Sequence, residues 1–216
     1  VKLILKLLKK DKNMIVLIIG LVIFFGMHLV PVTGVKSSLI ERMGEKKYQS
    51  IFSIISLVGF IIIIYGFSLI DTCNSMMADC ETDNFFLWDS FEYSKEISFL
   101  LMPISIIFIV ASQMKSNIKK VVHHPMLIGV LIWSFVHLLS TGDLRSIILF
   151  ASFGAFSIID IIFTRKTAEQ GISFSILNDV VVIVVGLVLY SIILYFHEYV
   201  SGLQIVERGN LLFFLP

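Results

Sequence analysis

The sequence carries little charge for its length. Only 15% of its 216 residues are Asp, Glu, Lys or Arg, whereas 57% are hydrophobic. A soluble domain carries about 25% charged residues, and one soluble core has no room for so many apolar side chains. The net charge of +1 leaves no basic surface for a nucleic acid. The composition therefore predicts a polytopic membrane protein whose partner is the lipid bilayer.

Several motifs of soluble enzymes are also missing from the sequence. There is no glycine-rich phosphate loop, no nucleophile elbow and no CxxC pair. These absences remove the usual signals for nucleotide chemistry, for serine hydrolysis and for thiol–disulfide exchange. Nothing in the sequence marks a particular substrate, and the sequence leaves open whether the protein is an enzyme.

Six apolar segments approach the length of about 20 residues that a helix needs to cross a bilayer. They are Met14–Val32, Tyr48–Ile70, Ile97–Met114, Val121–Ser140, Leu144–Phe163 and Ile176–His197. A sheet is not expected, because its open edges would leave backbone groups unpaired in lipid. We therefore predict an all-α polytopic membrane helix bundle of about six transmembrane helices over residues 14–197.

The segments outside the spans differ in charge. Residues 1–13 carry five lysines and are expected to form an interfacial helix. Residues 35–47 are polar and helical in character, and residues 198–216 form a C-terminal tail. The loop 71–96 holds seven acidic residues, one lysine and both cysteines, Cys73 and Cys80. These cysteines either form a disulfide or remain ordinary thiols.

Basic residues give a partial signal for orientation. The connections after the first, third and fifth segments hold nine Lys and Arg, against three on the other side. The positive-inside rule then places the acidic cysteine loop outside the cytoplasm, and we expect a bacterial inner membrane location. The five lysines of the N-terminal tail oppose this orientation, which therefore stays open.

Four of the five histidines lie inside or at the ends of the apolar segments. They are His28, His124, His137 and His197. An ionisable side chain at this depth indicates a functional site by default, although a neutral histidine bonded to a neighbouring helix explains any single one. Along the chain, His28 and His124 fall near one membrane face, and His137 and His197 fall near the other.

Two imidazoles on different helices can bind one haem iron from its two sides. His124 and His137 are thirteen residues apart, about 20 Å along a helix, so they cannot share one metal. Pairing across helices, His28 with His124 and His137 with His197, is compatible with the sequence. Zinc is less favoured, because no third ligand stands at a matching depth.

Three further features have both a functional and a purely structural interpretation. The stretch from His124 to Gly129 is either a helix start with a packing notch or part of a cofactor cradle. Trp133 either stacks on a cofactor or packs the bundle. Asp160 either pairs with Arg165 and Lys166 near the headgroups or handles protons.

Three blocks together resemble the NnrU family of membrane proteins. They are "GMHLVP", "ERMGEKKYQSIFSIISLVG" and "HPMLIGVLIWSFVHLLSTGDLRSIILFASFGAF". The likeness covers most of residues 20–163 and continues loosely to "FHEYVSG". Plant 15-cis-ζ-carotene isomerases are similar over the same blocks. The sequence departs from these relatives at His123, where they usually carry Arg, and at Glu198, where Pro is expected.

The resemblance implies two roles. One is nitrite or nitric oxide metabolism, and the other is the haem b-dependent isomerisation of an apolar polyene. It implies haem-iron ligands at His28 and His137, with His124 as the histidine of the His-Pro motif. A lipid-soluble substrate and a membrane redox partner would accompany these roles.

Two alternatives remain beside the resemblance. The HPxxxG pattern is also similar to the helix start that membrane methyltransferases use to bind S-adenosylmethionine, with Glu207 and Arg208 as further candidates. A haem-bearing sensor or an assembly partner of a nitrogen-oxide reductase would need no catalysis at all.

Overall fold

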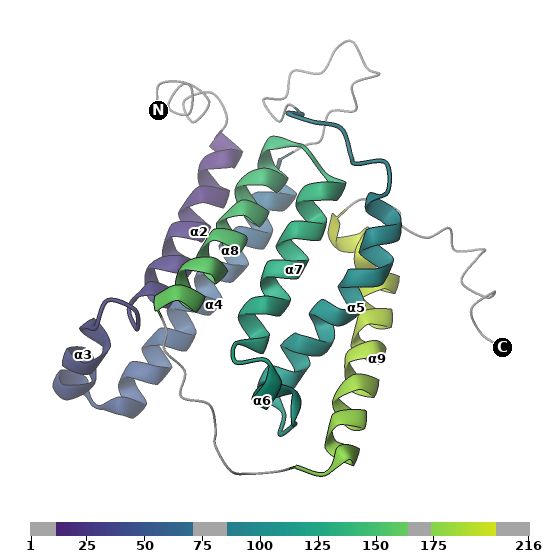
Figure 1. Cartoon of the computed structure of the whole chain (residues 1–216). Helices are drawn as coiled ribbons and strands as arrows, with labels where there is room; N and C mark the ends of the chain where they lie inside the picture. Colours follow the sequence, from purple (N-terminus) through teal and green to yellow (C-terminus); the bar gives the residue numbers. More distant parts are fainter. Residues whose placement is uncertain (1–11, 71–85, 164–173, 202–216) are drawn as a thin grey trace.

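The structure is a computed structural model that describes residues 12–70, 86–163 and 174–201 (Figure 1). Its long helices lie side by side, and consecutive long helices along the chain run in opposite directions. The helices are α2 (Lys12–Leu29), α3 (Val35–Met43), α4 (Glu45–Ser68), α5 (Ser94–Gln113), α6 (Ile118–Val121), α7 (Pro125–Ser140), α8 (Leu144–Phe163) and α9 (Ile176–Ser201). A bilayer core requires that the backbone hydrogen bonds be made within each helix and that the side chains be apolar, and the long helices meet both conditions.

Four of these helices are long and apolar enough to cross a membrane, and two shorter apolar helices lie beside them. The four are Glu45–Ser68, Ser94–Gln113, Leu144–Phe163 and Ile176–Tyr199; the shorter two are Asn13–Leu29 and Pro125–Ser140. The predicted all-α membrane bundle is therefore confirmed.

Most predicted span ends differ from the structure by a few residues, and two differences change a span. Residues 30–32 form a turn, so α2 ends earlier than the first apolar segment. The fourth segment is interrupted after Val121, and α7 begins only at Pro125. Proline disfavours a helical conformation in the residue before it, which accounts for the break at His124. The helical connection expected over residues 35–47 is present as α3.

Several predictions fall outside the described residues. They concern residues 1–11 of the interfacial helix expected over residues 1–13, Cys73 and Cys80, the partners Arg165 and Lys166 of Asp160, and Glu207 and Arg208. These stay predictions.

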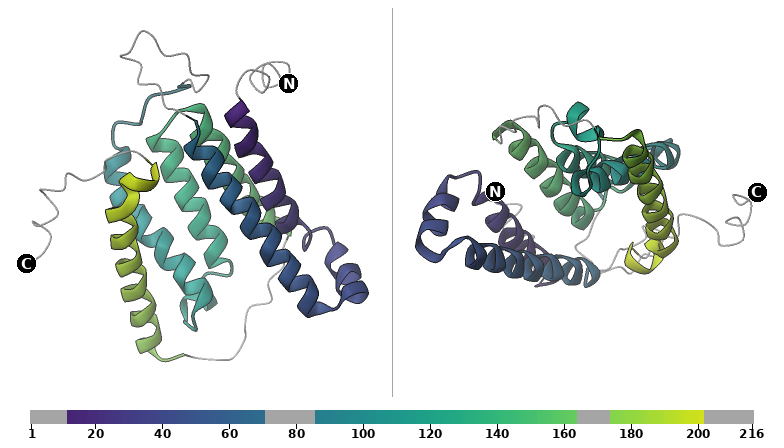
Figure 2. Two further views of the ribbon diagram at one scale, coloured as in Figure 1. Left: turned by 180° about the vertical axis from the view of Figure 1, so that it is seen from behind. Right: turned by 90° about the horizontal axis from the view of Figure 1, so that it is seen from below.

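The helices pack as a curved row in the order α4, α2, α8, α7, α5 and α9. Seen from below, the α2–α4 pair and the α5–α9 pair lie on opposite sides of the molecule (Figure 2). The sequence order of the spans is therefore not their order in space, because α8 lies between α2 and α7.

Glycines allow the closest approaches between these helices. A Cβ atom at Gly66 of α4 would lie 2.5 Å from the backbone nitrogen of Leu17 in α2. A Cβ at Gly129 of α7 would lie 2.7 Å from the carbonyl oxygen of Ser105 in α5, and the Ser105 hydroxyl donates to the Gly129 carbonyl at 2.7 Å. Small residues and hydroxyl groups of this kind hold membrane helices together. Pro125 and Gly129 thus fit the helix-start interpretation of the HPxxxG pattern.

Candidate histidine site

Two intramembrane histidines are held in the same way by their own helices. Nδ1 of His28 lies 2.8 Å from the carbonyl oxygen of Phe24, and Nδ1 of His137 lies 2.7 Å from that of Trp133. A carbonyl only accepts hydrogen bonds, so each Nδ1 carries a proton. In the neutral ring, Nε2 then holds the lone pair. Metal-binding histidines are commonly oriented by such a bond.

Each of these imidazoles also stacks on a phenylalanine. The ring centroids of His28 and Phe24 are 4.1 Å apart, at an interplanar angle of 27°. Those of His137 and Phe150 are 4.4 Å apart, at 26°. The backbone bond and the stacking together restrict rotation of the ring. Both side chains are therefore preorganised to present Nε2 in a fixed direction.

The structure brings His137 and His197 together across two helices. Their ring centroids are 6.3 Å apart and their planes differ by 28°. A metal ion bound to both imidazoles at about 2 Å per bond would hold the ring centroids roughly 6 Å apart. His137 lies in the last turn of α7, and His197 lies four residues before the end of α9. Both helices end at the upper end of the bundle in Figure 1. The two histidines that the sequence places near the same membrane face are thus neighbours, and their role as cofactor ligands stays a prediction.

His28 has aromatic neighbours instead of a second imidazole. Its ring lies 5.2 Å from Phe52 of α4 and 5.9 Å from Phe156 of α8. His124 precedes the first residue of α7, and α8 separates α7 from α2. The described contacts therefore do not bring His28 and His124 together.

His28 and His137 are connected by a chain of aromatic contacts between the two ends of the bundle. Neighbouring ring centroids along it are 5.0 to 5.9 Å apart. In order, the rings are His28, Phe156, Phe25, Phe153, Trp133 and His137. The shorter route through Phe24, Phe153 and Trp133 still leaves three rings between them, so these contacts do not place His28 and His137 against one another as a direct pair. Trp133 packs on Phe150 and Phe153 in addition to His137.

The donor set restricts which metal centre the pair can form. Among the described residues, no group of three or more His, Cys, Asp or Glu side chains is placed to hold a metal ion. A structural zinc site normally needs four protein ligands. A macrocycle that supplies four nitrogens needs only two axial ligands from the protein. Two neighbouring imidazoles therefore match the number of protein ligands that a haem needs, and they are too few for a structural zinc site.

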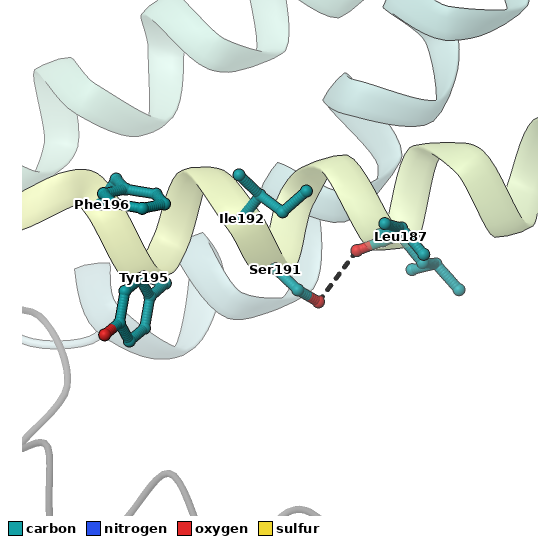
Figure 3. A pocket seen from close by; sticks show the side chains of 6 residues that line it. Leu187, Ser191, Ile192, Tyr195 and Phe196 are labelled. Carbon is teal, nitrogen blue, oxygen red and sulfur yellow. Dashed lines mark hydrogen bonds between the residues drawn. The ribbon is translucent and has the colours of Figure 1, made fainter.

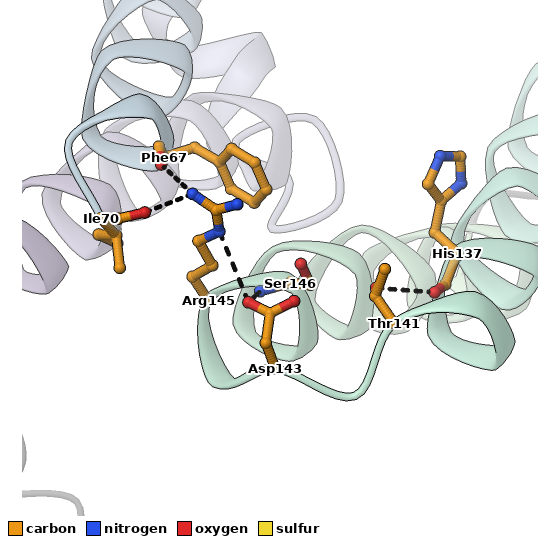
Figure 4. Close-up of polar contacts among 7 residues, drawn as sticks. All are labelled: Phe67, Ile70, His137, Thr141, Asp143, Arg145 and Ser146. Carbon is orange, nitrogen blue, oxygen red and sulfur yellow. Dashed lines mark hydrogen bonds and ion pairs between the residues drawn. The ribbon is translucent and has the colours of Figure 1, made fainter. Parts of the chain in front are cut away.

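A buried ion pair next to this site was not recognised from the sequence. Arg145 donates hydrogen bonds to the carbonyls of Phe67, at 3.2 Å, and Ile70 at the C-terminal end of α4. Its guanidinium stacks 4.3 Å above the Phe67 ring, and its Nε lies 3.5 Å from Asp143 (Figure 4). A cation at a helix C-terminus is favourable. The pair ties the start of α8 to α4, and the only local signal was two charges inside "GDLR".

An apolar hollow of about 400 Å³ runs along α9 (Figure 3). It is lined by Leu187, Val188, Ser191, Ile192, Tyr195 and Phe196. The Ser191 hydroxyl donates to the carbonyl of Leu187 at 2.9 Å. The lining therefore supplies no nucleophile–base pair, and the histidine pair remains the chemically distinctive feature.

These observations define the class: a multi-spanning helical membrane protein with two neighbouring histidines near one end of its bundle. The chain belongs to the NnrU family, whose model, described as NnrU protein, matches residues 16–205. That range includes all four intramembrane histidines. No curated protein and no solved structure matches the chain.

Proposed function

We propose that this NnrU-family protein binds haem b within the membrane, with His137 and His197 as the axial ligands. The 6.3 Å separation of the two rings is the observation that carries the proposal. This assignment differs from the pair that family resemblance implies, in which His28 and His137 serve the iron. His28 and His124 are then structural or belong to a different site.

The surroundings of His137 suit a flat apolar cofactor. The ring is packed among Trp133 and Phe150, which exclude water, and the Trp133 carbonyl orients it. When bound, haem would supply an iron centre that changes oxidation state and coordination. The protein would contribute ligand identity, ring orientation and a low-polarity environment.

The packing of α9 suggests which ligand is exchangeable. This helix packs chiefly on α5, and its apolar side chains are exposed along most of its length. His197 is therefore easier to displace than His137, because His137 packs against Trp133 of α7 and Phe150 of α8. A haem held mainly by His137 would then leave its His197 side accessible to a small nitrogen oxide or a conjugated double bond.

The proposed physiological role is nitrogen-oxide metabolism, with isomerisation of an apolar polyene as the other haem-dependent reaction. The support for both is family membership together with the histidine pair. In either role the substrate would reach the site from the lipid or from the nearby membrane surface. A membrane redox partner would set the oxidation state.

The test is an absorption spectrum of the purified protein during haem titration, oxidised and then reduced. We expect saturable binding at one haem per chain and the sharp, split visible bands of six-coordinate low-spin ferrous haem. Failure to develop a Soret band above that of haem in empty detergent micelles would refute the proposal.

A further inference from the structure

Residues 86–93, here termed the roof segment, cross the upper end of α7 and α8. The segment donates three hydrogen bonds to carbonyls at this end. They run from Leu87 N to Gly142 O at 2.8 Å, from Phe91 N to Leu139 O at 2.9 Å, and from Trp88 Nε1 to Leu138 O at 3.0 Å. The last carbonyls of a helix have no partner within it. The roof segment thus satisfies carbonyls that α7 and its following turn would leave unpaired.

Gly142 makes this close approach possible. A Cβ atom at this position would lie only 1.9 Å from the carbonyl oxygen of Trp88, so any other residue would push the segment away. Phe86 also forms an isolated antiparallel bridge with Asp143. The backbone of the roof segment is therefore fixed to the bundle.

The apolar side chains of the same segment stay largely exposed, including Trp88, whose indole ring rests against the end of α7. The segment's large apolar side chains are exposed to between 41% for Trp88 and 57% for Tyr93. The others are Phe86, Leu87 and Phe91. Apolar patches of this kind on a fixed backbone mark an interaction surface.

The location of these exposed apolar side chains, here termed the patch, indicates the environment that contacts them. The exposed tyrosines Tyr65 of α4 and Tyr195 and Tyr199 of α9 lie at the same end of the bundle. Tryptophan and tyrosine concentrate where acyl chains meet headgroups. The patch also continues into α5, whose exposed Phe99 and Leu100 belong to a candidate membrane span.

The opposite end of the bundle has a different character. Its connections carry Lys36, Lys46, Lys47, Lys115, Lys119 and Lys120. By contrast, the exposed Trp and Tyr side chains of the described residues all lie at the end that carries the roof segment. Among the described residues, the opposite end is therefore the richer in lysine, and the end at which α2 begins with Lys12 is the aromatic end, which includes the roof segment.

We propose that the roof segment lies in the boundary between headgroups and acyl chains of the leaflet at the aromatic end. The aromatic side chains enter the lipid, while the exposed carboxylates Asp89 and Glu92 stay among the headgroups. Their negative charge favours zwitterionic over anionic lipids. The segment holds the bundle at a fixed depth and covers the end of α7 three residues beyond His137.

The two tryptophans of the chain allow a direct test. The variant Trp133→Phe keeps Trp88 as its single tryptophan and is reconstituted into phosphatidylcholine vesicles. We expect lipids brominated near the glycerol end to quench Trp88 more strongly than lipids brominated near the methyl end, with little quenching by aqueous iodide. Strong iodide quenching without lipid quenching would overturn the proposal and would indicate a surface for water or a soluble partner.

A matched pair of glycine substitutions tests the anchoring. Gly142→Ala in the Trp133→Phe background should raise iodide quenching of Trp88 and shift its emission to longer wavelength. Gly26→Ala is the control, because a Cβ at Gly26 meets nothing within 4 Å. The same substitutions in a Trp88→Phe background report through Trp133 whether the bundle stays folded. Unchanged Trp88 quenching in folded Gly142→Ala protein would contradict the inferred anchoring.

Discussion

His28 and His137 are oriented by the same kind of contacts within their own helices, but their neighbours on other helices differ. Each imidazole is anchored through Nδ1 to the carbonyl four residues earlier and stacks on a phenylalanine. His137 then faces a second imidazole, His197, whereas His28 faces Phe52 and Phe156. A local sequence pattern thus orients the ring, but packing between distant helices decides whether it can share a metal.

The largest expected difference between the two environments is in haem affinity. His137→Gln removes the better-packed ligand and should weaken haem binding more than about tenfold, since even outer-shell changes at metal sites cost 10- to 100-fold. Equilibrium titration followed at the Soret band measures the effect. The matched control is His124→Gln at the other end of α7, for which affinity within about twofold of the original is expected. Equal losses in the two variants would show that His137 has no special role.

Arg145→Ala should loosen the connection between α4 and α8. The change leaves Asp143, 2% exposed, without its cation and removes two hydrogen bonds from α4 carbonyls. Breaking a buried ion pair on one side typically costs about 3 kcal/mol or more. Thermal or denaturant unfolding in detergent reports the loss. Arg145→Lys, which retains the charge, should recover part of the stability; an unchanged midpoint for Arg145→Ala would argue against this connection.

Asp179→Ala should affect the His137–His197 environment and spare that of His28. Asp179 accepts hydrogen bonds from the backbone and side-chain nitrogens of Asn117 at 2.7 and 2.8 Å, which fixes the start of α9. Hydrogen bonds to a charged group contribute about 1.5–3 kcal/mol. We expect a partial loss of the low-spin haem spectrum, on the argument that releasing the start of α9 lets the whole helix shift and carries His197 with it. Ser191→Ala on the same helix is the control and should retain the full spectrum.

The smallest effect on haem binding is expected for the substitution of His28. His28→Gln removes an imidazole that has no second imidazole beside it, so haem affinity should stay within about twofold by the same titration, on the argument that only direct and adjacent ligand contacts govern it. A tenfold loss here would support the His28–His137 assignment that the family resemblance implies.

Much of the fold was accessible from the sequence because membrane spans depend on composition and length. The depth of each histidine followed from its distance to a span end, which was enough to match His137 with His197. The lateral order of the helices was not accessible. For example, α9 packs on α5 where Gly186 approaches Ile107. No pattern in the sequence around Gly186 indicates which helix it contacts.

For the same reason, the pairing of His28 with His124 could not be decided in advance. Both lie at the same depth, but α8 intervenes between their helices. Arg145 was counted only as a loop charge, although its side chain is buried against the end of α4. The roof segment gave no signal beyond its aromatic content, since its anchoring depends on the turn at Gly142.

The most direct test of the His137–His197 assignment is the electron paramagnetic resonance spectrum of the ferric, haem-loaded protein. The original protein and His28→Gln should both give the low-spin signal of an iron with two imidazole ligands. His197→Gln should lose that signal and regain it when free imidazole is added. A low-spin signal that persists in His197→Gln and disappears in His28→Gln would contradict the account.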